Sequence, residues 1–173
     1  MTIKQVTILH SALQLFADEG YNFTTTKRVA VAAGVSEGLI FRHFGSKGGL
    51  LKAVLELGEV RVKSLYTSIL EEADPRTIIR KSISIPFEVP PSDYPFWRLQ
   101  YKLKWELNLS ADDKMKPLEQ TLTIAFRALG TPDPEREAKH LLRVIDAIGG
   151  DILKGSLTDL EDTTQWLMLK YGV

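Results

Sequence analysis

The side chains best suited to contacting another molecule lie between residues 36 and 44, where charged, polar and small residues alternate with apolar ones. Ile40 and Phe44 are four residues apart, the spacing that places two side chains on one face of a helix. The opposite face is then left free and carries Glu37, Gly38, Leu39, Arg42 and His43. Groups of this kind on an exposed helix can contact the base edges and phosphates of DNA.

Gly38 is unusual in this predicted helix, because glycine in a helix costs about 1 kcal/mol relative to alanine. A close approach of the backbone to another molecule explains why it is there. The alternative is that glycine is merely tolerated near the start of the helix.

A second short helix precedes this one. Thr24, Thr25 or Thr26 can cap it, and it is predicted to run over 27–33. Gly34 follows at the position where a left-handed residue ends a helix, and Ser36 is expected to cap the next helix. Two short helices joined by a glycine turn are typical of a helix-turn-helix, whose second helix enters a DNA groove.

Residues 8–54 resemble the DNA-binding domain of the TetR (tetracycline repressor) family of transcriptional regulators. The resemblance rests on residue types kept in register along the stretch. They are Ile8, Leu9, Ala12, Leu13, Leu15, Phe16, Ala17, Gly20, Tyr21, Thr24, Thr25, Thr26, Ala30, Ala33, Gly34, Val35, Ser36, Gly38, Phe41, His43, Phe44, Ser46 and Lys47.

The resemblance implies a role for each residue of the predicted interface. Phosphate contacts are expected from Thr25 or Thr26, from His43 and from Lys47. Residues expected to face the bases are Lys27, Glu37, Gly38, Leu39 and Arg42. The predicted interface also includes Arg28, Ser36 and Phe41. Phe41 stands where the family usually has a tyrosine, so the phenolic hydroxyl is missing here.

Composition narrows the class of protein further. The 173 residues contain no cysteine, which excludes disulfides and cysteine-ligated zinc. There is neither an apolar span of membrane length nor the apolar region of a signal peptide, so we expect a cytoplasmic protein without a membrane segment. The balance of 22 basic and 22 acidic residues does not indicate a general nucleic-acid binder, and the motif carries that prediction instead.

Hydrophobic spacing along the rest of the chain predicts an all-α protein. We expect a helix-turn-helix DNA-binding domain over 1–50 and a helical effector-binding and dimerisation domain over 51–173. Its helices are predicted at 46–73, 75–85, 93–108, 111–129, 133–153 and 157–171. Four prolines between 86 and 95 interrupt the pattern, since each removes a backbone N–H.

Aromatic residues mark a candidate binding site for a small molecule. Three of them stand at positions i, i+4 and i+8 of one helix, and two more lie in neighbouring segments. The predicted ligand-binding residues are Phe87, Trp97, Tyr101, Trp105 and Phe126. Members of the family typically enclose an effector in the second domain, and aromatic side chains often line such cavities. The alternative is that these rings belong to the ordinary core.

The last two predicted helices carry broad apolar stripes. The first consists of Ala138, Leu141, Leu142, Ile145, Ile148 and Ile152, and the second of Leu160, Trp166, Leu167 and Tyr171. Because the family pairs its two C-terminal helices across a two-fold axis, we expect a homodimer through about 133–171. The alternative is that both stripes are core within one chain.

Together these features predict a TetR-like regulator that binds a palindromic DNA operator as a homodimer, represses transcription and is released by a small-molecule effector. The alternative is a ligand-independent DNA-binding regulator controlled by a protein partner at 86–95. We predict no enzyme, metal or cofactor. The three histidines are scattered, and the Glu71–Glu72 and Asp112–Asp113 pairs are adjacent helix-end residues that do not face one another.

Overall fold

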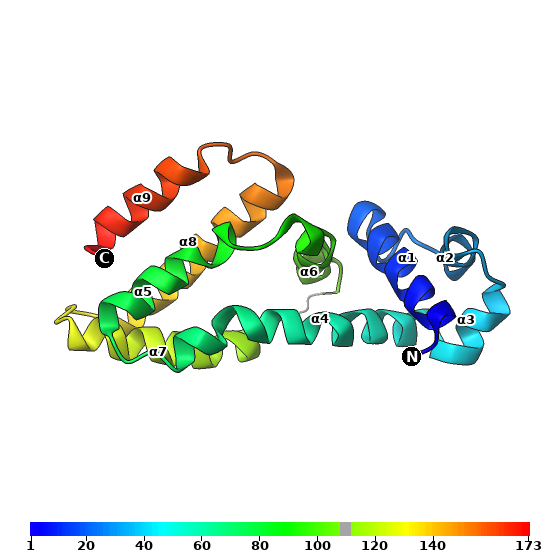
Figure 1. Ribbon diagram of the computed structural model, residues 1–173, viewed down its shortest axis with the longest axis horizontal. Helices are drawn as coiled ribbons and strands as arrows, with labels where there is room; N and C mark the ends of the chain where they lie inside the picture. Colours follow the sequence, from blue (N-terminus) through cyan, green and yellow to red (C-terminus); the bar gives the residue numbers. More distant parts are fainter. Residues whose placement is uncertain (108–111) are drawn as a thin grey trace. The chain divides into compact units, whose positions relative to one another are not determined.

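The computed structural model describes the backbone of residues 1–107 and 112–173; within these ranges the side chains of residues 59–62, 64, 65 and 112–114 are not described. In the described part every regular element is a helix, which confirms the predicted fold class (Figure 1). The α-helices are α1 (Ile3–Glu19), α2 (Thr26–Ala33), α3 (Glu37–Phe44), α4 (Lys47–Leu70), α5 (Pro75–Ser84), α6 (Tyr94–Glu106), α7 (Asp112–Ala128), α8 (Pro134–Lys154) and α9 (Leu160–Tyr171). Two 3₁₀ turns, η1 (Ile85–Phe87) and η2 (Pro91–Asp93), occupy the proline-rich segment.

Local capping sets the limits of the first three helices. The Thr25 hydroxyl accepts a hydrogen bond from the Arg28 N–H and so caps α2. Gly34 ends that helix in the left-handed conformation, with φ of 64°, as predicted. Ser36 occupies the N-cap position of α3, as predicted, but its side chain makes no capping hydrogen bond. Glu37 in the first turn of α3 supplies a negative charge that complements the helix dipole instead.

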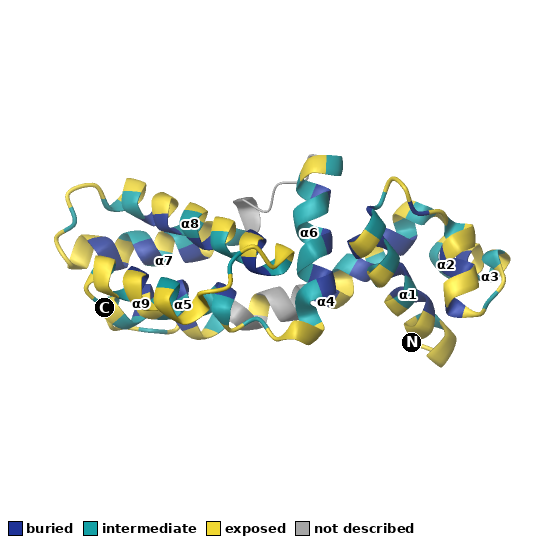
Figure 2. Cartoon of the chain, turned by 90° about the horizontal axis from the view of Figure 1, so that it is seen from above, coloured by how far each residue is buried: buried dark blue, intermediate teal, exposed yellow. Residues whose placement is uncertain are grey.

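The described residues group into two compact units, the first formed by 1–62 and 92–109 and the second by 63–91 and 110–173. This grouping differs from the predicted division at residue 50, because α6 packs with the N-terminal helices. Leu99 and Leu103 of α6 are fully buried in the same apolar core as Ile8 and Phe16 of α1. Figure 2 shows buried segments on α1 and α6 and exposed segments on α2 and α3.

A glycine lets α6 lie directly on α4 within the first unit. A Cβ atom added to Gly58 would lie 1.6 Å from the Phe96 ring, well inside the distance of any real contact. Phe96 itself is fully buried. The absence of a side chain at residue 58 therefore fixes where α6 packs in this unit.

The long helix α4 ends three residues earlier than predicted, at Leu70 instead of about Ala73. The Glu72 carboxylate accepts hydrogen bonds from the backbone N–H groups of Ala73, at 2.9 Å, and Asp74, at 3.2 Å. Asp74 in turn caps α5 by accepting from the Thr77 N–H at 2.8 Å. These local bonds compete with continued helix, and Pro75 prevents its extension.

Several residues used in predicting these helices lie outside the described part. They are the side chains of Arg61, Leu65, Asp112 and Asp113, and Ser110. The predicted start of α7 at Ser110 therefore lies outside the described residues. No helix among the described residues is long and apolar enough to cross a membrane.

The second unit has its own core, formed by α4 from residue 63, α5, α7, α8 and α9. Its buried residues include Ile79, Leu122, Leu141 and Leu167. The apolar stripe of α8 packs into this core, where Ala138 is fully buried. Our interpretation of that stripe as a dimer interface is therefore wrong for its buried residues, because an amphipathic helix looks alike whether its partner is its own chain or another.

Candidate DNA-binding surface

The face that α3 leaves exposed is narrower than predicted. Ile40 is fully buried, and Leu39 and Phe44 are half-buried against the same core. Arg42 is exposed, and Phe41 is 46 % exposed although its ring replaces a polar tyrosine. Leu39 is thus partly in the core and partly in solvent. The exposed face is formed chiefly by Gly38, Phe41 and Arg42.

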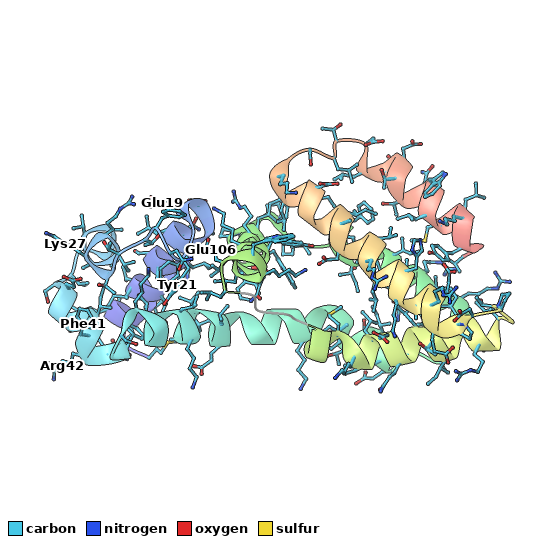
Figure 3. The ribbon with its side chains drawn as sticks, turned by 180° about the vertical axis from the view of Figure 1, so that it is seen from behind. Glu19, Tyr21, Lys27, Phe41, Arg42 and Glu106 are labelled. Atoms are coloured by element: carbon cyan, nitrogen blue, oxygen red, sulfur yellow. The ribbon has the colours of Figure 1, made fainter. Side chains whose placement is uncertain are left out.

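Figure 3 places Phe41, Arg42 and Lys27 at one end of the first unit, away from α6. Lys27 is exposed at the start of α2, and Ser36 is exposed just before α3. Gly38 is exposed as well, and a Cβ atom added there meets no atom within 4 Å. The fold itself therefore does not require a glycine at residue 38.

The two candidate phosphate-binding threonines are used differently by the protein. The Thr25 hydroxyl accepts the capping bond from the Arg28 N–H at 3.2 Å. The Thr26 hydroxyl instead donates a hydrogen bond of 2.6 Å to Oε1 of Glu37. This second bond joins the first residue of α2 to the first residue of α3 across the turn.

Arg28 belongs to the predicted interface but is already paired inside the protein. Its guanidinium donates two hydrogen bonds to the two carboxylate oxygens of Glu19, at the end of α1. Such a forked pair is the most favourable geometry for an arginine and a carboxylate. The charge of Arg28 is therefore compensated before any DNA arrives.

Lys47 also makes its contacts within the protein. Its ammonium lies 4.3 Å from the centre of the Tyr21 ring and 3.4 Å from the Asn22 carbonyl oxygen. Partial burial lowers the pKa of Lys47, and the negative charge of Glu106 acts in the opposite direction. In this conformation Lys47 faces the turn between α1 and α2, so it does not extend freely into solvent as a phosphate ligand would.

His43 is half-buried and lies next to α1. Its Nδ1 atom is 3.5 Å from Nε2 of Gln5. The Gln5 carbonyl accepts from the Thr2 N–H at 2.8 Å in a capping box, which orients the Gln5 amide so that its NH₂ group faces the histidine. Because an amide NH₂ only donates, this contact is a hydrogen bond in the tautomer whose Nδ1 carries no proton.

Three side chains of α6 contact the end of α1 and the following turn, and none of them was predicted. The Glu106 carboxylate accepts from the Asn22 N–H at 2.8 Å. The Lys102 ammonium donates to the Asp18 carbonyl oxygen at 2.7 Å, and Arg98 lies 4.0 Å from the Asp18 carboxylate. Figure 3 shows Glu106 on the side of the unit where Tyr21 lies.

The spacing of charged residues along α6 is a sequence signal for this contact. Arg98, Lys102 and Glu106 are spaced at i, i+4 and i+8, as are Trp97, Tyr101 and Trp105. From the sequence we predict a function for the aromatic set and make no prediction for Arg98 and Lys102. Gly20 lies beside this contact. A Cβ atom added there would lie 2.4 Å from Glu106, so the glycine leaves room for the carboxylate.

The predicted ligand-binding aromatics are divided between the two units. Trp97 and Tyr101 are half-buried in the first unit, whereas Trp105 is 88 % exposed and so belongs to neither core nor an enclosed lining. In the second unit Phe126 is buried in the core, 5.8 Å from the Tyr171 ring, and Phe87 is half-buried against that core.

Two surface hollows of the second unit contain none of these aromatics. One is lined by acidic residues and their neighbours at 158–162 and by Gln165. The other is lined by charged residues at the start of α8, among them Arg136 and His140. Both hollows are open and polar, unlike the apolar cavities that usually hold small organic ligands.

Comparison with known proteins identifies the class. Residues 8–54, which span α1, α2, α3 and the start of α4, match the family described as "Bacterial regulatory proteins, tetR family". The chain is 45 % identical over 67 residues to the uncharacterized HTH-type transcriptional regulator YvkB of Bacillus subtilis, covering 39 % of this chain and 33 % of that protein. It is 28 % identical over 148 residues to the HTH-type transcriptional regulatory protein RaaS of Mycobacterium tuberculosis, covering 83 % and 66 %.

Solved structures show that the likeness in fold extends over nearly the whole chain. A TetR-like transcriptional regulator from a Rhodococcus species has a TM-score of 0.79 at 18 % identity, with 96 % of this chain and 92 % of that chain covered. A regulator from Saccharomonospora viridis in complex with choline has a TM-score of 0.75 at 21 % identity, covering 94 % and 92 %. FadR of Bacillus subtilis in complex with stearoyl-CoA has a TM-score of 0.66 at 18 % identity, covering 94 % and 95 %.

The protein is thus an all-helical protein with an N-terminal helix-turn-helix. Residues 8–54 match the tetR family of bacterial regulatory proteins, and the fold of the chain is that of solved TetR-like regulators. The stretch matched to YvkB spans about a third of that relative's length, 33 %.

Proposed function

We propose that the chain is a transcriptional regulator that binds a palindromic DNA operator as a homodimer. The observation that carries this proposal is the exposed end of the helix-turn-helix, where Arg42 and Lys27 point into solvent from α3 and α2. An arginine there can donate two hydrogen bonds to O6 and N7 of a guanine in the major groove. A DNA-binding role also implies that the protein works in the cytoplasm.

Selection of bound sequences from a random DNA pool tests this proposal. We expect a palindrome whose half-sites are centred about one helical turn, or a multiple of it, apart, because a symmetric dimer presents two identical helices. Recovery of a single half-site contradicts the dimer, and failure to enrich any sequence contradicts DNA recognition.

The dimer is proposed to form through exposed residues within about 133–171. Leu169 is 81 % exposed and Trp166 59 % exposed on α9, so these side chains are accessible on a single chain. Leu169→Asp is expected to dissociate the dimer in sedimentation experiments. Ile124→Asp is the matched control, since Ile124 is 63 % exposed on α7, outside this region. Equal dissociation by both variants contradicts the assigned surface.

A small-molecule effector is proposed to release the operator, and repression is the expected outcome of binding. The structures with choline and stearoyl-CoA support effector control in proteins of this fold. A ligand lowers operator affinity only by binding better to a conformation that does not fit the DNA. Competition between a small-molecule library and labelled operator tests this. The alternative, control by a protein partner at 86–95, predicts that no small molecule competes and that a partner does.

A further inference from the structure

A short hydrogen bond connects the two helices of the helix-turn-helix. The Thr26 hydroxyl and Oε1 of Glu37 are 2.6 Å apart, within the range for an O–H donor and a carboxylate. Both side chains are only partly exposed, so water competes weakly for this contact. The bond therefore restricts the position of the Glu37 carboxylate at the start of α3.

The direction of this bond separates the roles of Thr25 and Thr26. Phosphate oxygens only accept hydrogen bonds, so a threonine that contacts a phosphate must donate its single hydroxyl hydrogen. Thr26 donates that hydrogen to Glu37. Thr25 accepts the Arg28 N–H with an oxygen lone pair, which leaves its own hydrogen for a phosphate. Of the two threonines, Thr25 therefore has the hydroxyl hydrogen that is available to a phosphate.

Glu37 retains a second carboxylate oxygen that can accept a hydrogen bond from outside the protein. Phosphates repel it, and so do the acceptor atoms of guanine and thymine in the major groove. The donors available there are the amino groups of cytosine and adenine. Cytosine is the better match, because adenine also presents the acceptor N7 beside its amino group.

We propose that Thr26 is a positioning residue that holds Glu37 so that its free oxygen accepts from N4 of a cytosine in each operator half-site. This inference rests on the proposed DNA-binding function. The hydroxyl of Thr26 acts on sequence preference through Glu37 and makes no phosphate contact of its own. Without it, the carboxylate rotates among several positions, and preference at that base pair falls.

The test measures base preference separately from overall affinity. The operator is first obtained by selection with the wild-type protein. The base pair read by Glu37 is then the one whose preference disappears in Glu37→Ala. Thr26→Val, which keeps the shape but lacks the hydroxyl, is expected to reduce preference at that same C·G pair by about fivefold, within the range of one base contact. The salt dependence of binding should stay unchanged, because no phosphate contact is lost.

Matched variants complete the design. Thr26→Ser keeps a hydroxyl and should retain the preference. Thr25→Val should weaken binding to all sequences and lower the salt slope by about one, as expected for loss of a phosphate contact. In the Glu37→Ala background, Thr26→Val should cause no further change in preference. Thermal unfolding verifies that each variant folds, and Thr26→Ala replaces Thr26→Val if valine destabilises α2.

The outcomes separate this inference from the proposed function. A uniform loss of affinity with a lower salt slope in Thr26→Val overturns it, since Thr26 would then contact a phosphate. Unchanged preference in Thr26→Val also overturns it, as does a Glu37-dependent position at which an A·T pair is preferred. A wild-type protein that enriches no sequence refutes the proposed function itself.

Discussion

The outer face of α3 and the turn between α1 and α2 use positive charge in opposite ways. Arg42 is exposed on α3. Around the turn, Arg28 is paired with Glu19, and the Lys47 ammonium lies over Tyr21 with Glu106 nearby. A cation in the sequence is therefore not always a cation available to DNA, and Arg42 on the outer face of α3 is less engaged within the protein than Arg28 and Lys47.

The largest expected difference is between two arginines. Arg42→Ala should lower affinity for the selected operator by about 5- to 150-fold, the value of one guanine contact of about 1–3 kcal/mol. Arg28→Ala should have a much smaller effect, because Arg28 is bound to Glu19. Fluorescence anisotropy with the operator and with scrambled DNA measures both. Equal losses in the two variants contradict the distinction between the exposed face of α3 and the turn.

Substitutions at two glycines, one at the turn and one on α3, should change the stability of the protein in opposite directions. Gly20 has φ of 97°, and an added Cβ atom meets Glu106 at 2.4 Å. Gly20→Ala should therefore destabilise the protein by at least about 1 kcal/mol. Gly38→Ala should stabilise α3 by about 0.5–1 kcal/mol.

Denaturant unfolding measures these changes, and DNA binding separates the two sites further. Although Gly38→Ala gains stability, it should bind the operator more weakly if the α3 backbone approaches the DNA closely. Undiminished operator affinity in Gly38→Ala supports the alternative, that this glycine is merely tolerated near the helix start.

Removing the charge that pairs with Arg28 should make this arginine available to DNA, as Arg42 already is. Glu19→Gln removes the negative charge that pairs with Arg28. Affinity for non-specific DNA at low salt should rise several-fold, with a salt slope larger by up to about one. Glu135→Gln is the control, because Glu135 pairs with Arg127 in the second unit. An equal rise in both variants indicates a general charge effect.

The smallest effect concerns a carboxylate that serves stability alone. Hydrogen bonds from Lys81 and from the backbone N–H groups of Asp74 and Ala73 lower the pKa of Glu72 from 4.5 to about 2. Because the folded-state pKa is the lower one, this stabilisation is present above pH 4.5 and is lost as the pH falls toward about 2.

Unfolding midpoints measured across this pH range test that assignment. In Glu72→Gln the fall in stability between pH 4.5 and about 2 should be shallower than in the wild type. DNA binding at neutral pH should not change. An unaltered pH profile contradicts the role assigned to Glu72.

The helix-turn-helix was predictable because its determinants are local. Thr25 caps α2 through Arg28, only three residues away. Gly34 ends α2 in a left-handed conformation that favours glycine. Ile40 follows from helical spacing alone. The exposed position of Arg42 then follows, since it lies on the opposite face.

The partners of the charged residues could not be predicted in the same way. Glu106 contacts Asn22 across 84 residues of chain, and no local pattern encodes that pairing. The α8 stripe around Leu141 has the same spacing whether it packs within the chain or against a second copy. Trp105 and Glu106 are neighbours on one helix, and only the packing of α6 decides which of them meets α1.

The hydrogen bond from the Asn22 N–H to Glu106 gives the protein a built-in reporter. We expect the proton of this amide to exchange with deuterated water more slowly while α6 contacts the turn than after the two separate. The exchange rate of that amide would report, without any added label, how often α6 separates from the turn.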